Sequence, residues 1–215
     1  TMAIIAANAF VFLRQAGLTA DDMDVFIRAF GLVAAAFSWL NVVTSMFVHG
    51  GLMHFAGNML YLWIFGDNVE DRMGHGRFLV FSLLCAPGAA LAQTAAVPGS
   101  IVPMVGASGA IAGVMGAYFV LYPKSRVLTL IPFPIAVVEI PAVYLLGLWF
   151  VMQFVSGVAT LGPQAEGRMV GGVAFWAHAA GFGVGALLVF VFGLGWFPPA
   201  GWGGLEHLVL PSLVL

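Results

Sequence analysis

Long apolar stretches, separated by short polar or Gly/Pro-rich clusters, make up most of the chain. The breaks leave six apolar segments, at about residues 1–13, 51–66, 78–97, 105–122, 134–156 and 173–195. A helix that crosses the hydrocarbon core of a bilayer needs about 20 mostly apolar residues. The pattern therefore predicts an all-α polytopic membrane bundle with six transmembrane helices. The first segment is too short for a span, and we expect it to be a truncated first helix.

The remaining regions have other patterns. In the long connection 15–48, three aspartates at 21, 22 and 24 precede a periodic apolar run, which is typical of a helix start. We expect amphipathic helices that lie at the membrane interface there. Near the other end, Pro198–Gly204 breaks the sixth segment. We therefore expect one membrane domain over residues 1–200, with 201–215 as a C-terminal tail or the start of a truncated further segment.

Composition supports a membrane protein. Hydrophobic residues are 62% of the chain and charged residues 7%, whereas a soluble domain is about 25% charged. So few charges cannot cover a water-exposed surface, so the lipid bilayer is the expected environment. The chain has no basic tract that would indicate nucleic-acid binding, and its single cysteine, Cys85, excludes an intrachain disulfide.

Basic residues predict the orientation in the membrane. Arginines and lysines occur in two short connections, 72–77 and 124–126, and are absent from 98–103. The positive-inside rule places the first two connections on the cytoplasmic side. Ser108, early in the fourth segment, and His178, early in the sixth, should then lie at similar depth near the opposite side.

Ser108 and His178 are the candidate reactive pair. A hydroxyl nucleophile and a possible base at membrane depth are costly to bury and indicate function. Each lies beside a face of small residues, which lets helices approach closely; the glycines are Gly106, Gly109, Gly113 and Gly116 in the fourth segment, and Gly181 and Gly185 in the sixth. We expect this approach to bring the Ser108 hydroxyl within hydrogen-bonding distance of His178.

The second segment offers hydrogen-bond donors. His54 and Asn58 are four residues apart and so share one face of a helix. Both side chains can donate, which suits the stabilisation of an oxyanion in a dry site. His49 lies five residues before His54 and should point elsewhere or precede the helix.

Each feature taken alone has a simpler structural explanation. Small-residue faces mostly serve packing, and a membrane serine often bonds its own helix backbone. A single histidine can equally bind metal or bridge two helices. The segment Gly106–Gly109 is not the Gly-x-Ser-x-Gly nucleophile elbow, because Ala110 stands in the last position.

Together, the three motifs resemble the rhomboid intramembrane serine proteases. Residues 49–58 match His-x4-His-x3-Asn, residues 106–109 match Gly-x-Ser-Gly, and residues 177–185 match Ala-His-x-x-Gly-x-x-x-Gly. The order of the three motifs and the segments in which they occur also agree with this family, and the resemblance covers about residues 1–195.

The resemblance implies a serine endopeptidase that uses no metal and no cofactor. Its substrates would be membrane proteins, cut within or near a transmembrane segment. The implied roles are Ser108 as nucleophile, His178 as general base, His54, Asn58 and the Ser108 N–H as oxyanion hole, and His49 and Gly106 in support.

Two positions depart from the family pattern. Leu40 follows Trp39, where some members have Trp-Arg, and Ala112 stands where the best-studied members place an aromatic ring against the catalytic imidazole. The dyad is unaffected by either change, but the sequence then names no group that orients the ring of His178.

Two other functions remain as alternatives. One is a catalytically silent relative that binds membrane clients, although such relatives typically lack the nucleophile or the base. The other is a carrier or a metal-binding protein that uses His49, His54 and His178. The scarcity of acidic residues argues against it, since Glu139 is the only one inside a candidate span. The absence of eukaryotic-style extensions leads us to expect a multi-pass protein of the bacterial plasma membrane.

Overall fold

The fold is that of a computed structural model, which describes residues 1–132, 135–161 and 173–192. The helices are α1 (Met2–Ala16), α2 (Ala20–Phe30), α3 (Trp39–Thr44), α4 (Leu52–Met73), α5 (His75–Ala96), α6 (Ser108–Leu121), α7 (Ala142–Ala159) and α8 (Phe175–Phe192). Two short 3₁₀ turns, η1 (Ala34–Ala36) and η2 (Ser45–Phe47), flank α3. The predicted helical membrane bundle is confirmed.

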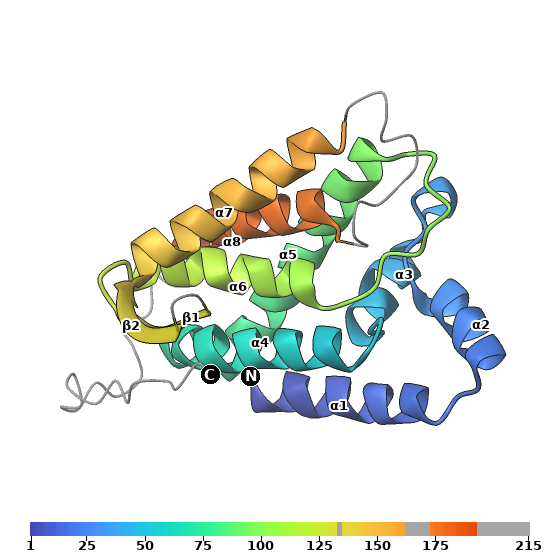
Figure 1. The fold of residues 1–215 in the computed structure, drawn as a ribbon, viewed down its shortest axis with the longest axis horizontal. Coiled ribbons are helices and arrows are strands. Elements are labelled where there is room, and N and C mark those ends of the chain that lie inside the picture. Colours follow the sequence, from blue (N-terminus) through green and yellow to red (C-terminus); the bar gives the residue numbers. More distant parts are fainter. Residues whose placement is uncertain (133–134, 162–172, 193–215) are drawn as a thin grey trace.

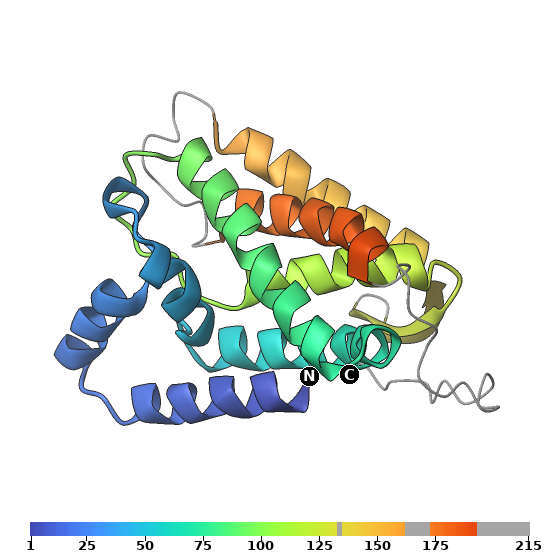
Figure 2. The ribbon, with the colours of Figure 1, turned by 180° about the vertical axis from the view of Figure 1, so that it is seen from behind.

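Helix α6 lies at the centre of the bundle. Helix α8 packs along it, α5 crosses both helices obliquely, and α4 lies on another side (Figures 1 and 2). Helix α7 covers α8 from outside, and α1 runs beside α4. The central position of α6 is reflected in its burial, since every side chain from Ala110 to Tyr118 is buried.

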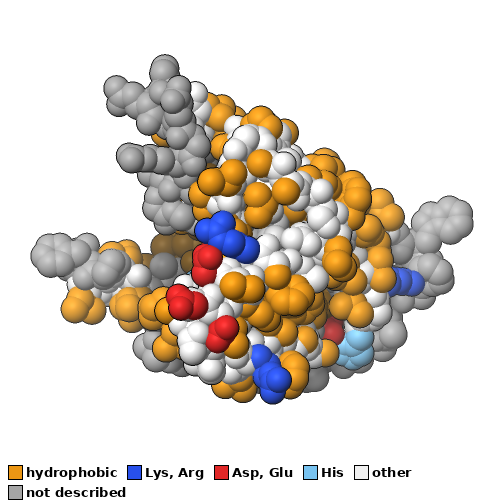
Figure 3. All heavy atoms as spheres, turned by 90° about the vertical axis from the view of Figure 1, so that its right-hand side faces the viewer, with side chains coloured by type: hydrophobic (Ala, Val, Ile, Leu, Met, Phe, Trp, Pro, Cys, Tyr) orange, Lys and Arg blue, Asp and Glu red, His pale blue; other side chains and the backbone are white. Residues whose placement is uncertain are grey.

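The outer surface is apolar. On α7, hydrophobic side chains face outward along the helix, among them Tyr144, Leu148, Val151, Met152 and Val155. At the end of the molecule that carries α2 and α3, hydrophobic side chains cover much of the described surface, beside a small group of acidic and basic side chains (Figure 3). Such a surface fits lipid, since soluble proteins rarely expose large contiguous apolar patches.

Within the described part of the chain, three helices, α5, α7 and α8, are long and apolar enough to cross a membrane; α1 and α6 are apolar but shorter. With 14 residues, α6 is about 21 Å long, less than the ~30 Å of the hydrocarbon core. If its far end lies at one membrane surface, Ser108 at its first turn lies within the bilayer. The segment before it, 97–107, is held by an antiparallel bridge between Leu32 and Met104. Non-helical backbone at such depth requires protein or a water-filled cavity around it.

The prediction of one span over 134–156 was wrong at its beginning. Strands β1 (Arg126–Pro132) and β2 (Ile135–Pro141) form an antiparallel hairpin, and α7 begins only at Ala142. Exposure alternates along β2, as expected for β-branched residues in a half-buried strand. Glu139 therefore lies in the hairpin, 3.7 Å from the guanidinium of Arg126, and not in a membrane span.

The long first connection is helical as predicted. Helix α2 begins at an acidic turn, where the Thr19 hydroxyl caps it by accepting a hydrogen bond from the Asp22 N–H at 3.2 Å. The prediction that these helices lie at the membrane interface stays a prediction.

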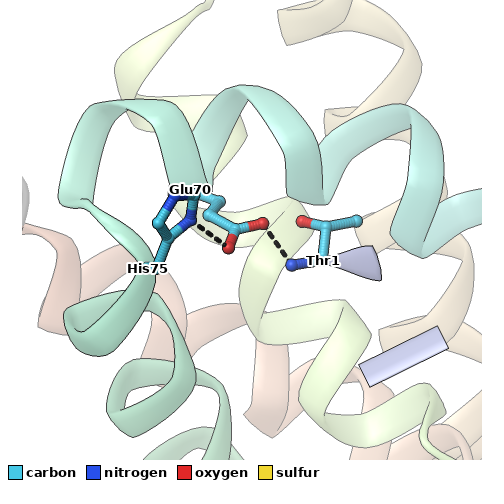
Figure 4. A network of polar contacts seen from close by, with 3 residues as sticks. All are labelled: Thr1, Glu70 and His75. Atoms are coloured by element: carbon cyan, nitrogen blue, oxygen red, sulfur yellow. Dashed lines mark hydrogen bonds and ion pairs between the residues drawn. The ribbon is translucent and has the colours of Figure 1, made fainter. Parts of the chain in front are cut away.

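Contacts at one end of the bundle tie the helices together. The Tyr122 hydroxyl, just after α6, donates to the Asn68 carbonyl of α4 at 3.0 Å. Glu70 of α4 contacts the amino group of Thr1 and lies 2.7 Å from His75 Nδ1 at the start of α5 (Figure 4). Both predicted cytoplasmic connections therefore lie at the same end. The predicted tail, 201–215, lies outside the described residues.

Candidate active site

Ser108 and His178 come together at the centre of the bundle. Ser108 is the first residue of α6, and His178 lies in the first turn of α8. The distance between Ser108 Oγ and His178 Nε2 is 2.8 Å, although 70 positions separate the two residues. This is hydrogen-bonding distance, as proton transfer requires.

The glycines lie where α6 and α8 cross. A Cβ atom at Gly181 would overlap the carbonyl oxygen of Gly109, and one at Gly185 would overlap that of Gly113. Gly109 also faces α5, where a Cβ would lie 2.7 Å from the Cβ of Ala89. Main chain therefore packs directly against main chain between the two helices that carry the dyad.

His54 and Asn58 lie against the segment that leads to Ser108. A Cβ at Gly106 would approach the His54 ring to 2.7 Å and Asn58 Nδ2 to 3.4 Å. Gly106 has a φ of +114°, which L side chains rarely adopt, and its N–H donates to the Ser45 carbonyl at 2.8 Å. Gly106 thus holds the turn and leaves room for both side chains.

Both side chains have a donor available. His54 Nδ1 accepts from the Gly50 N–H at 3.3 Å, so the proton of a neutral ring is on Nε2, one of the ring atoms nearest Gly106. Asn58 is buried, and its Nδ2 has no hydrogen-bond partner among the described residues. A buried donor without a partner is costly and calls for an explanation.

The His49 ring packs edge-on against the His54 ring, with 5.3 Å between the centroids. His49 is 1% exposed, and its backbone forms a reciprocal pair with Gln15 of α1, whose side chain donates to the His49 carbonyl and accepts from the His49 N–H, both at 3.0 Å. Burial, and secondarily the neighbouring His54, lowers the pKa of His49 to about 4. His49 is therefore a neutral anchor that joins α1 to the segment before α4.

A cavity of about 540 Å³ connects the candidate residues. Its lining includes Ser108, His178, His54, Asn58 and Trp149, and its volume is in the range of small-molecule sites. His54 is exposed at its wall, so the cavity reaches the molecular surface. A half-buried hydroxyl–imidazole pair thus faces a space that is open at the molecular surface.

Three residues of the site were missed by the sequence analysis. Gln153 of α7 places its Oε1 2.8 Å from His178 Nδ1, and the Trp149 ring lies 5.8 Å from the imidazole, centroid to centroid. Gln93 of α5 accepts from the Ala177 N–H at 3.3 Å. For Gln93 and Gln153 the signal was a strongly polar amide inside an apolar segment, which is expensive there and marks function. Trp149 carried no such signal, since an aromatic residue is ordinary in an apolar span.

The arrangement does not favour a metal centre. Among the described residues there is no group of three or more His, Cys, Asp or Glu side chains placed to hold a metal ion. Both ring nitrogens of His178 are already taken, by Ser108 and by Gln153.

Comparison with known proteins places the chain in a family. The profile of the Rhomboid domain matches residues 36–195. The rhomboid protease GluP of Bacillus subtilis is 36% identical over 88 residues, which are 41% of this chain and 17% of that protein. The mitochondrial rhomboid protein 1 of Saccharomyces cerevisiae is 33% identical over 108 residues, 46% of this chain and 29% of that protein. The chloroplastic rhomboid-like protein 11 of Arabidopsis thaliana is 32% identical over 168 residues, 76% of this chain and 55% of that protein.

The aligned part covers little more than half of even the best-covered of these three relatives. They come from a bacterium, a mitochondrion and a chloroplast, so the similarity supports an integral membrane protein but not a bacterial plasma membrane. With the motifs, the fold and the profile in agreement, the chain belongs to the rhomboid family.

Proposed function

We propose that the chain is an intramembrane serine endopeptidase that cuts membrane proteins within or near a transmembrane segment. The observation that carries the proposal is the 2.8 Å approach of Ser108 Oγ to His178 Nε2 beside a cavity that also holds His54 and Asn58. A hydroxyl paired with a base and facing two available donors is the arrangement of acyl transfer.

The first chemical step is acylation of the serine. His178 Nε2 takes the proton of the Ser108 hydroxyl while Oγ attacks the carbonyl carbon of the scissile peptide bond. The tetrahedral intermediate collapses when the protonated His178 gives this proton to the leaving amine, which breaks the C–N bond. Water, activated by the same imidazole, then hydrolyses the Ser108 ester and restores the free enzyme.

Three donors at the cavity that contains Ser108 are available to the developing oxyanion. They are Asn58 Nδ2, His54 Nε2 and the backbone N–H of Ser108. Ser108 begins α6, so its N–H has no partner within the helix, and the positive end of the helix dipole favours negative charge there. Such preorganised donors lower the barrier because they need no reorganisation during the reaction.

The surroundings favour a membrane-embedded substrate. The cavity lies among helices whose outer faces are apolar, so a peptide segment in the bilayer can approach it without entering bulk water. A helical substrate has its carbonyl groups hydrogen-bonded, so residues that weaken helices, Gly or Pro, near the cut should aid cleavage.

Reconstitution with a substrate tests the proposal. The purified chain and a single-pass membrane protein with a Gly-containing transmembrane segment are placed in liposomes, and fragments are identified by mass spectrometry. We expect cleavage within or near the segment, and none with Ser108→Ala. The alternative, a client-binding relative, would instead bind the segment equally well in both forms and cut it in neither.

A further inference from the structure

We propose that Gln153 is the positioning residue of His178, through a hydrogen bond from the ring N–H at Nδ1 to the side-chain amide oxygen. This inference rests on the proposed protease function and adds a third member to the Ser108–His178 pair. It also identifies a group that orients the His178 ring, which the small side chain of Ala112 cannot do.

The geometry supplies the first argument. Gln153 Oε1 lies 2.8 Å from His178 Nδ1, and Ser108 Oγ lies 2.8 Å from Nε2, so the ring is held from both sides. An amide oxygen can only accept, which requires the proton of the neutral imidazole to be on Nδ1. Nε2 then presents its lone pair to the Ser108 hydroxyl, as a general base must. In the other tautomer Nε2 would carry a proton and could not receive one.

The second argument is that helix α7, and not α6, contacts the His178 ring. Ala112 of α6 is fully buried and packs close to Gly181 of α8, so it serves the crossing of the two helices and has no side chain to hold a ring. Trp149 and Gln153, four residues apart, share one face of α7. The Trp149 ring is inclined by 31° to the imidazole. Helix α7 therefore supplies both the tilted aromatic contact and the hydrogen bond.

The third argument is energetic. A carboxylate in this position would add a charge to an apolar bundle, which is expensive. A neutral amide fixes the tautomer at much lower cost, and a strongly polar side chain within an apolar span persists when it has such a partner. The pairing explains why glutamine interrupts the run of apolar residues in α7.

Substitution of Gln153 is the first test. Gln153→Met keeps the length of the side chain and removes the acceptor, whereas Gln153→Glu keeps an acceptor at the same reach. Met152→Ala is the matched control, since the adjacent Met152 side chain is 57% exposed. Turnover, KM, thermal stability in detergent and the rate of fluorophosphonate labelling are measured for each variant.

We expect Gln153→Met to lower kcat at least about tenfold with KM within about twofold, as for loss of an interaction that acts in the transition state. The labelling rate should fall in parallel, because it reports activation of Ser108 without substrate binding. Gln153→Glu should retain clearly more activity, and Met152→Ala should resemble the wild type. A folded Gln153→Met protein with wild-type kcat and labelling rate would overturn the proposal, as would an equal loss of kcat in Met and Glu variants that both retain the wild-type fold.

The wild-type protein offers a second test that needs no stable variant at Gln153. In protein labelled with ¹⁵N-histidine, with His178→Ala used for assignment, the chemical shifts tell which ring nitrogen of His178 carries the proton. We expect protonated Nδ1 and unprotonated Nε2; the opposite tautomer overturns the proposal. If the wild type neither cleaves nor labels, the proposed function fails; if it does both and only the Gln153 results disagree, this inference alone fails.

Discussion

Gly181 of α8 lies so close to the main chain of α6 that a Cβ atom there would overlap the carbonyl oxygen of Gly109. Ser108 directly precedes Gly109, and His178 is one helical turn before Gly181. The same backbone contact therefore sets the distance between the hydroxyl and the imidazole. The packing of α6 against α8 and the geometry of the Ser108–His178 pair therefore depend on the same crossing of the two helices.

A methyl group at that crossing should separate the helices. Gly181→Ala is expected to destabilise the fold by about 1–3 kcal/mol, since an inserted carbon in a packed contact forces backbone shifts, and to abolish most cleavage by lengthening the dyad hydrogen bond. Unfolding in mixed micelles and a cleavage assay measure both effects. Gly183→Ala is the control, because a Cβ there meets nothing within 4 Å; equal behaviour of the two variants would contradict the assigned contact.

Removal of the Asn58 amide should affect the transition state more than substrate binding. Asn58→Ala is expected to lower kcat by about 10²-fold with little change in KM, as for loss of one oxyanion donor. Asn58→Asp should be as inactive, since a carboxylate cannot donate. Steady-state kinetics in detergent check this. An Asn58→Ala enzyme with wild-type kcat would assign Nδ2 a purely structural role.

Gly106 tests the turn before the nucleophile. Gly106→Ala combines an unfavourable φ of +114° with a Cβ 2.7 Å from the His54 ring, so we expect loss of cleavage and a destabilisation of about 1–2 kcal/mol. Gly99→Ala, in the same connection, meets nothing within 4 Å and should behave as the wild type. Activity of Gly106→Ala above half of the wild-type value would contradict the tight contact assigned between Gly106 and the His54 ring.

Gln15 anchors α1 to the loop before α4. Gln15→Met removes both hydrogen bonds to the His49 backbone and leaves a buried N–H and carbonyl without partners, which costs about 1–3 kcal/mol. Thermal unfolding should show this loss, and Leu13→Ala, whose side chain is 72% exposed on the same helix, should not. Unchanged stability of Gln15→Met would mean that water or lipid headgroups replace the lost bonds.

The parts of the fold that sequence could predict are those with a long uniform pattern. Apolar length placed α4, α5, α6 and α8 within a few residues of their observed starts, because burial in lipid imposes composition over a whole span. The hairpin before α7 was missed because β-branched residues such as Val137 and Val138 are as hydrophobic as the residues of a membrane helix. The alternation of exposed and partly buried side chains that distinguishes a strand covers only a few residues there. Hydropathy alone does not reveal it.

The site shows a similar division. Ser108, His178, His54 and Asn58 stand in spaced motifs, so their sequence positions carry information about which residues share a helix face. Gln153 has no such motif, and its contact with His178 depends on the rotation of α7 against α8. Only tertiary packing fixes that rotation, so the group that holds the imidazole could be found only in three dimensions.

The central claim is that Ser108 is a nucleophile activated by His178, and phosphonylation measures this most directly. The purified protein in detergent is treated with a fluorophosphonate, digested and analysed by mass spectrometry, beside Ser108→Ala and His178→Ala proteins of verified fold. We expect the adduct on the peptide that contains Ser108, with none in the serine variant and labelling slowed by orders of magnitude in the histidine variant. Labelling of His178→Ala at the wild-type rate, or no adduct on Ser108 in the folded wild type, would contradict the account.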